Sequence, residues 1–226
     1  MSEHLIRREL RAVLAAALLR EGAKRIREES LLVLDLSDLI KPYAKKMEHL
    51  ATVRDGSRKE LGQGYWLCQV IGTENRVEEE ASAVTPLYGE LYSQKAPDFV
   101  SENHEILRAI AEVSAATAKR GIWIIDRGGD RGELYSELVP VEKGRRFIIR
   151  QMGNRDLLWG RQRLSTAAVV ERCALPYATT VVREEHGQEK VYRLEYGFAV
   201  VRLPEYPEVA LALVVVKGFG ESRCYC

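Results

Sequence analysis

The sequence of 226 residues has few of the residues that mark a disulfide-rich or metal-binding protein: four cysteines and four histidines. The cysteines share no metal-ligand spacing with the scattered histidines. Cys224 and Cys226 form a C-x-C, which could bind a metal, but without a second pair this spacing more often has no such role. This cysteine usage argues against a zinc module and fits a reducing compartment.

Long apolar segments are absent as well. No run reaches the ~18 residues that a membrane-spanning helix needs, and the opening MSEHLIRREL is too charged for a secretory signal peptide. The formal net charge is +1, so the chain as a whole is neither a strongly basic nor a strongly acidic protein. We therefore expect a cytoplasmic protein without a membrane partner, whose charges must be interpreted locally.

The hydrophobic pattern predicts an ordered series of elements in the first two thirds of the chain. A helix is expected over 3–29, although Gly22 should weaken its second half. Strands are expected over 31–36, 64–72 and 84–93, then a helix from an N-cap at Ser101 to Lys119, and a strand over 121–126. The predicted order is thus three strands, a helix and a strand. After about residue 140 the chain is rich in strand-like segments, with at most a short helix near STAAVVERC.

Two of the predicted buried strands end in an aspartate. VLDLSD contains Asp35 and Asp38, and WIIDRGGD contains Asp126, with Asp130 four residues later. Ionised carboxylates at the ends of core strands are costly unless a cation meets them, and Mg²⁺ prefers such oxygen ligands. A simpler alternative is that Asp35 and Asp126 cap loops, or pair with the nearby Lys41 and Arg127. The repetition of the pattern favours metal binding by the pair.

These segments resemble a known family. DLSDLIKPYAKKMEHLATVRDGSRKELGQGYWLCQV and GIWIIDRGGDRGEL are similar to the catalytic core of bacterial insertion-sequence transposases of the DDE type, in particular the insertion-sequence-four group. The D-x-[ST] start, the DGS turn, the G-Y-W strand and the D-R-G-x-D block occur in order, and the resemblance covers roughly residues 31–217. It implies an α/β fold with a ribonuclease H-like mixed sheet, flanking helices and a β-rich insertion at about 141–205. An N-terminal helical segment over 1–30 would precede this core, which would occupy 31–226.

The resemblance also implies the chemistry. Asp35 and Asp126 would be the first two catalytic carboxylates and would bind Mg²⁺ or Mn²⁺, whereas Asp130 and Arg127 would orient the loop or touch DNA. Asp38 is as consistent with a capping role. The expected reaction is metal-dependent phosphodiester hydrolysis and strand transfer at transposon ends.

The family's third carboxylate, a glutamate in a helical Y-x-x-R-x-x-x-E pattern, is not found after Asp126. YRLE at 192–195 has the wrong spacing, and Glu221 follows the last predicted strand too closely to the end of the chain. We therefore expect a core that is truncated before its C-terminal catalytic helix and is weakly active or inactive. Two alternatives stay open: a remnant that binds DNA or full-length transposase as an inhibitor, and a stand-alone ribonuclease H-like nuclease.

Local basic clusters indicate where double-stranded DNA would bind. The interval from Lys143 to Arg163 holds seven basic residues opposed in that interval only by Asp156, and KPYAKK follows the first aspartate. Such clusters are also common on ordinary solvated surfaces. The residues predicted to contact DNA are Lys41, Lys45, Lys46, Arg127, Arg145, Arg146, Arg150 and Arg155. A DNA-binding protein of this kind would associate with the nucleoid, and it could also bind a second copy of itself.

Overall fold

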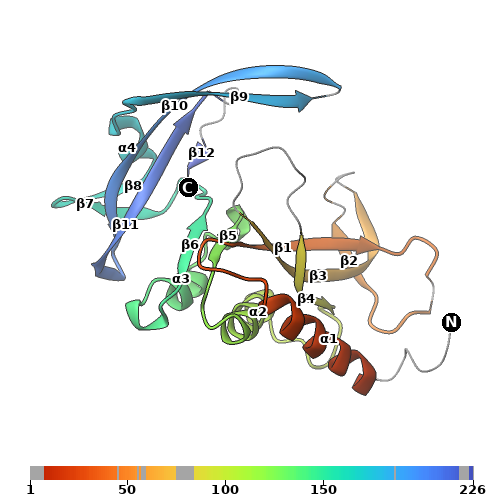
Figure 1. The fold of residues 1–226 in the computed structure, drawn as a ribbon. Helices are drawn as coiled ribbons and strands as arrows, with labels where there is room; N and C mark the ends of the chain where they lie inside the picture. The colour runs from red at the N-terminus through yellow and green to blue at the C-terminus, as the bar shows by residue number, and fades with distance from the viewer. Residues whose placement is uncertain are drawn as a thin grey trace. The chain divides into compact units, whose positions relative to one another are not determined.

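The computed structural model describes residues 8–44, 46–54, 56, 60–74, 84–185, 187–218 and 224–225. The chain forms two compact units, the first consisting of Met1–Ile125 with Arg145–Phe147 and the second of Asp126–Gly144 with Ile148–Cys226. The described residues form a mixed α/β structure with two six-stranded sheets and four α-helices (Figure 1). No helix among them is long and apolar enough to cross a membrane.

The first sheet confirms the predicted order of elements and adds a short strand to it. Its strands run in the order β2-β3-β1-β5-β6, with β4 also paired to β3. β1 is antiparallel to β3 and parallel to β5, and α1 and α2 lie on the same side of the sheet (Figure 1). The elements are α1 (Arg8–Ala23), β1 (Leu31–Ile40), β2 (Ala51–Arg54), β3 (Leu61–Thr73), β4 (Thr85–Tyr92), α2 (Glu102–Ala116), β5 (Ile122–Ile125) and β6 (Arg146–Ile149).

Strand β1 is longer than the predicted 31–36 and is not buried on both faces. Leu32 and Leu34 are buried, whereas Asp35 is exposed. The strand continues to Ile40 because its antiparallel ladder with β3 does not stop: Asp35 pairs with Gln69, and the register runs on without a break. The prediction that β1 ends at Asp35 is therefore wrong. What ends there is the parallel pairing with β5.

Helix α2 begins where its sequence predicts. The Ser101 hydroxyl accepts a hydrogen bond from the His104 N–H at 3.1 Å, which satisfies one of the unpaired amides of the first turn. The fully buried side chains of α2, Ile110 and Val113 among them, belong to the same core as Leu32 on β1 and Val70 on β3. This core holds β1, β3 and α2 together beneath the region that contains Asp35.

Gly22 has a packing role that the hydrophobic pattern of the helix does not indicate. A Cβ at this position would lie 2.6 Å from the main-chain oxygen of Pro86 and 2.9 Å from Leu87 Cδ2. The glycine therefore lets α1 approach β4 closely, and its low helix propensity is offset by tertiary packing. The predicted extension of the helix to residue 29 is wrong, since α1 ends at Ala23, one residue after Gly22, while the predicted residues 3–7 lie outside the described part of the chain.

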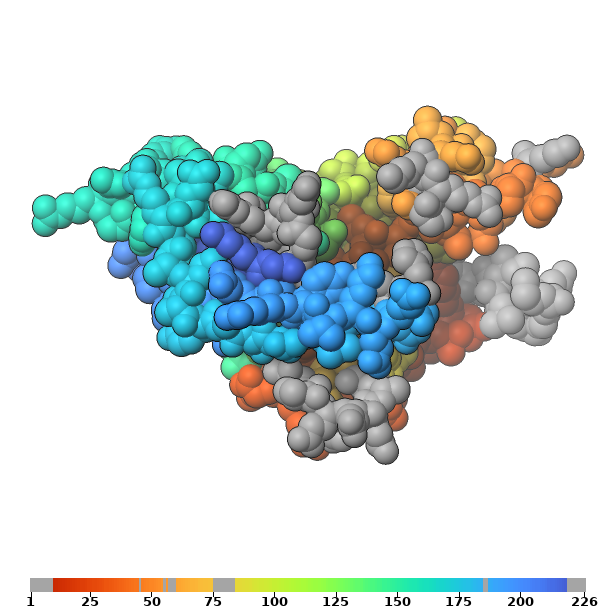
Figure 2. All heavy atoms as spheres, turned by 90° about the horizontal axis from the view of Figure 1, so that it is seen from above, coloured from red at the N-terminus to blue at the C-terminus, as the bar shows by residue number. Residues whose placement is uncertain are grey.

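The second unit contains short helices and a second, mainly antiparallel sheet. Its strands run in the order β12-β11-β10-β7-β8, with β9 paired to β10. The β9–β10 hairpin keeps its register from Tyr177↔Tyr196 to Glu185↔Gln188 and forms an elongated light-blue band in Figure 2. The elements are η2 (a 3₁₀ helix, Arg127–Gly129), α3 (Gly132–Leu138), η3 (Val141–Lys143), β7 (Asp156–Trp159), β8 (Gln162–Ser165), α4 (Thr166–Arg172), β9 (Tyr177–Glu185), β10 (Gln188–Leu203), β11 (Tyr206–Lys217) and β12 (Cys224–Tyr225).

Candidate functional site

Asp35 lies on an exposed part of β1 and is oriented by its neighbours on the same face of the sheet. Its Oδ2 accepts a hydrogen bond from the Ser37 hydroxyl at 2.8 Å. Ser37 Oγ in turn accepts one from Gln69 Nε2 at 3.4 Å. Because residues i and i+2 of a strand share a face, this short chain of polar groups fixes the side chain of Asp35 without burying it.

Asp126 directly follows β5 and is the N-cap of η2. Its Oδ1 accepts a hydrogen bond from the Gly128 N–H at 2.8 Å, and the side chain is exposed. The geometry agrees with the capping alternative that the sequence left open. Capping uses one carboxylate oxygen and does not exclude a second role for the other.

The parallel register of β1 and β5 connects the two positions. Leu31 pairs with Ile122 and the register continues to Leu34 with Ile125, which is the last residue of β5. In each strand the next residue along the chain is an aspartate, Asp35 after Leu34 and Asp126 after Ile125. The carboxyl edge of a parallel pair is a common place for ligand-binding groups.

The donor set available for a metal ion is small. Within the described ranges, no group of three or more His, Cys, Asp or Glu side chains is arranged to hold a metal. Mg²⁺ often takes only one or two protein carboxylates and keeps several waters. Asp35 and Asp126 are each of the residue type that Mg²⁺ binds, and their role as ligands stays a prediction.

The Asp38 side chain contacts a different segment of the chain. Its Oδ1 accepts a hydrogen bond from the Gly56 N–H at 3.0 Å, 18 residues away in the chain. Gly56 belongs to the DGS turn between β2 and β3, so Asp38 ties that turn to β1. The contact gives Asp38 a structural role, as the capping alternative predicted.

Asp130 is the most strongly bound carboxylate near Asp126 in the sequence. Its side chain is 1% exposed and pairs with Arg155, whose Nε donates to Oδ1 at 2.7 Å. The Met152 N–H donates to Oδ2 at 2.8 Å. The Arg155 guanidinium also lies 4.5 Å from the centre of the Tyr135 ring. Burial raises the pKa of the Tyr135 hydroxyl, and the charge of Asp130 raises it further. The loop that begins at Asp126 is thus fastened at its far end.

The basic residues predicted to contact DNA differ in what they already bind. Arg155 is held by Asp130, Arg146 pairs with Glu29 at 2.9 Å, and Arg145 Nε donates to the Ser114 hydroxyl at 3.1 Å. Acidic residues from elsewhere in the sequence, Glu29 and Asp130, pair with basic residues of the interval from Lys143 to Arg163. Asp156 is therefore not the only acid that balances their charge. Of the other predicted residues, Lys46 and Arg127 are exposed, Lys41 and Arg150 are half-buried, and Lys45 lies outside the described residues.

A buried titratable cluster beneath β1 escaped the sequence analysis. The Glu105 side chain is 7% exposed and pairs with Arg108 at 2.5 Å, and Arg108 Nε donates to the Tyr88 hydroxyl at 3.1 Å. Burial raises the pKa of Cys68 to about 12, with a further contribution from Glu105, and burial likewise raises the pKa of Tyr88 to about 12. The helical spacing of Glu105 and Arg108 was the available signal, but it did not indicate burial.

These two shifts predict a loss of stability in alkali. Both groups are neutral in the folded state and ionise more readily when unfolded, so their contribution is complete below about pH 9 and is lost as the pH rises from there towards 12. We expect the free energy of unfolding to fall over this window and Tyr88→Phe to make the fall shallower, as measured by urea titrations at several pH values.

We also expect Cys68 to resist iodoacetamide at pH 8 in mass-spectrometric mapping while Cys173, which is less buried, reacts. Rapid labelling of Cys68 in the folded protein would contradict this.

The comparisons with known proteins identify no family. Neither a protein-family model nor a curated protein matches the sequence. Among solved structures, the chain is similar to a piggyBac transposase determined by cryo-EM in a synaptic complex with hairpin DNA, with 11% sequence identity and a TM-score of 0.40. The match covers 94% of this chain and 40% of that chain, so the protein spans less than half the length of its structural neighbour.

Proposed function

We propose that this chain is the catalytic core of a DNA transposase of the DDE type, in which Asp35 and Asp126 bind a divalent ion and act on phosphodiester bonds of transposon-end DNA. The observation that supports the proposal is the parallel register of β1 and β5, whose last pair, Leu34 with Ile125, is followed in the sequence by an aspartate in each case. The shared motifs of the insertion-sequence-four group support it from the sequence.

The order and direction of the strands also support a ribonuclease H-like core. β1, β3 and β4 are successive antiparallel neighbours, α2 follows, and β5 returns parallel to β1. A crossover helix is the usual connection to a parallel strand. The arrangement is the one expected of a sheet that presents carboxylates at adjacent strand positions.

In the proposed site each aspartate would bind the ion while a local hydrogen-bond donor holds its side chain. A bound Mg²⁺ would stabilise negative charge on the phosphate under attack. Ser37 holds one oxygen of Asp35, and the Gly128 N–H holds one oxygen of Asp126, so each carboxylate keeps a second oxygen that could bind the ion. With two carboxylates the ion is held loosely, and loose positioning costs rate. We therefore expect slow nicking and little strand transfer.

The experiment is a nicking assay on a supercoiled plasmid carrying a transposon end, with the purified 226-residue chain in Mg²⁺, Mn²⁺ or EDTA. We expect metal-dependent nicking that Asp35→Asn and Asp126→Asn each reduce by about tenfold or more, since each removes a charged ligand. Asp156→Asn is the matched control, because Asp156 is an exposed aspartate paired with Arg163, and it should leave the rate unchanged. Nicking that persists in EDTA, or in both site variants, would contradict the proposal.

A non-catalytic role is the second candidate, and the absence of a three-acid group among the described residues favours it. In that case the chain would retain transposon-end DNA without cutting it, and Asp35→Asn would leave retention unchanged. Filter binding across a series of salt concentrations measures this, because phosphate contacts give a linear fall of log affinity with log salt. Lys46 and Arg127, both exposed, are the first basic residues to replace.

A further inference from the structure

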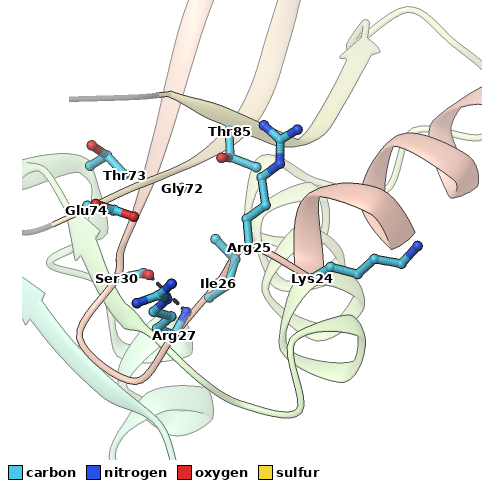
Figure 3. Close-up of a pocket in the computed structure, with 9 residues that line it drawn as sticks. All are labelled: Lys24, Arg25, Ile26, Arg27, Ser30, Gly72, Thr73, Glu74 and Thr85. Carbon is cyan, nitrogen blue, oxygen red and sulfur yellow. Dashed lines mark hydrogen bonds between the residues drawn. The ribbon is translucent and has the colours of Figure 1, made fainter. Parts of the chain in front are cut away.

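A second polar site lies in the first unit, in the loop between α1 and β1. Residues from this loop and from the adjoining ends of β3 and β4 enclose a cavity of about 310 Å³ (Figure 3), at the small end of the usual range for ligand sites. Its lining is mostly cationic or hydroxyl-bearing, with one carboxylate, and consists of Lys24, Arg25, Ile26, Arg27, Ser30, Gly72, Thr73, Glu74 and Thr85.

The loop that carries the cations is held in place by the fold. Ile26 is 2% exposed and packs so closely on β3 that a Cβ at Gly72 would lie 2.4 Å from its Cδ1. The Arg27 N–H donates to the Ser30 hydroxyl at 3.0 Å, and the Ile122 N–H donates to the Ser30 main-chain oxygen at 2.8 Å. The arginines on either side of Ile26 therefore start from a fixed backbone, which lowers the entropic cost of binding a ligand.

Two hydroxyl groups of the cavity are almost fully buried and have unused donors. Thr85 is 7% exposed, and its hydroxyl makes no hydrogen bond with the part of the chain that the structure describes. Ser30 is 4% exposed and uses its oxygen as an acceptor from Arg27, which leaves its proton available. Thr85 Oγ1 is not among the fully buried side-chain atoms that lack a partner, so this hydroxyl is open to the cavity. Hydroxyl donors that face a cavity beside arginines suit a ligand rich in acceptors.

The charges indicate the same kind of ligand. Arg25 and Arg27 make no ion pair with any described residue, whereas Lys24 pairs with Glu21 at 2.6 Å and points away from the cavity (Figure 3). The Arg25 side chain extends towards the start of β4, where Thr85 lies (Figure 3). Attraction between these cations and the end of the helix dipole explains a preference for basic residues here, but it does not explain the hydroxyl of Thr85.

We propose that this cavity binds a phosphate group, with Arg25 and Arg27 contacting its oxygens and the Thr85 and Ser30 hydroxyls donating to them. Guanidinium groups suit phosphate because their planar donors match its oxygens. Glu74 leaves the lining with a net positive charge, since Arg25 and Arg27 outnumber this one acid. The site does not depend on Asp35 or Asp126, so it can hold whether or not the chain cuts DNA.

The test is an NMR titration of the labelled protein with inorganic phosphate at pH 7, with sodium chloride keeping the ionic strength constant. We expect saturable shifts of the Ile26, Gly72 and Thr85 amides. Arg25→Gln should weaken binding by about fivefold or more, and Thr85→Val by about threefold, because one charge-assisted or one neutral hydrogen bond is lost. Thr85→Ser, which keeps the hydroxyl, should restore most of the affinity.

Arg20→Gln is the matched control, because it removes the same charge from an exposed position on α1 outside the cavity. Shifts that do not saturate, or an equal weakening by Arg20→Gln, would overturn the proposal by showing only non-specific charge. Competition by a nucleoside monophosphate and by a short duplex then identifies the source of the phosphate. A free monoester or a DNA backbone would both support the site, and displacement of inorganic phosphate by neither would contradict it.

Discussion

Replacing Asp130 by alanine is expected to lower the free energy of unfolding of the second unit by about 3–5 kcal/mol, the usual cost of breaking a buried ion pair on one side. The Asp130 carboxylate is 1% exposed and accepts hydrogen bonds from Arg155 Nε and the Met152 N–H. Its loss would leave the guanidinium of Arg155, itself only 17% exposed, without its anion. Urea unfolding followed by circular dichroism measures the change.

Two further variants separate the ion pair from simple loss of packing. Asp130→Leu combined with Arg155→Met removes both charges and should recover much of the stability, because a buried pair replaced by apolar groups is often neutral. Asp156→Ala breaks an exposed pair with Arg163 and should cost less than about 1 kcal/mol. If the double variant were as unstable as Asp130→Ala, the charge pairing would not be the cause.

The same contacts bear on the proposed function. Asp126 caps the 3₁₀ helix at the start of the loop, and Asp130 closes that helix four residues later. The anchoring of Asp130 by Arg155 therefore limits how far the loop after β5 can move. Arg155 was predicted to contact DNA, and the structure shows that its Nε is bound to Asp130. Whether its other guanidinium nitrogens contact DNA stays a prediction.

Features that depend on local chemistry were predictable from the sequence. The N-cap at Ser101 needs only a hydroxyl three residues before an amide, and the structure confirms it. The strand predicted over 121–126 is found as β5, one residue shorter at each end, because Asp126 leaves the sheet to cap the next turn. The helix α4 near Ser165 also follows from a local N-cap, since the Ser165 hydroxyl accepts from the Ala168 N–H.

Features that depend on contacts with residues distant in the sequence were not predictable from it. The ion pair of Arg146 was not foreseen, because its partner Glu29 is 117 residues away. The end of β1 was misplaced because the aspartate, which disfavours a buried strand, sits on an exposed position of a ladder that β3 continues. β2 was missed because its four residues, ATVR, lie among turn signals and are fixed only by pairing with β3. In each case the deciding contact is tertiary, and no pattern within the segment reports it.

Gly197→Ala is expected to destabilise the second sheet by about 3 kcal/mol, at the upper end of the cost of overpacking. Gly197 lies on β10, where the segment after α4 crosses the strand. A Cβ at this position would lie 2.0 Å from the main-chain oxygen of Ala174 and 3.2 Å from the Cα of Leu175. Both are backbone atoms, so no side-chain rotation can relieve the contact. Urea unfolding by circular dichroism gives the change directly.

Gly132→Ala is the control that isolates this contact. Gly132 is the first residue of α3 in the same unit, and a Cβ there would meet no atom within 4 Å. Alanine is also the better helix former, so this variant should be neutral or slightly stabilising. A comparable loss in both variants would contradict the steric explanation, because replacing glycine lowers the entropy of the unfolded chain and by itself favours folding. A loss confined to Gly197→Ala would show that the main chain between α4 and β9 packs directly on β10. This main-chain contact would then be what positions the long β9–β10 hairpin.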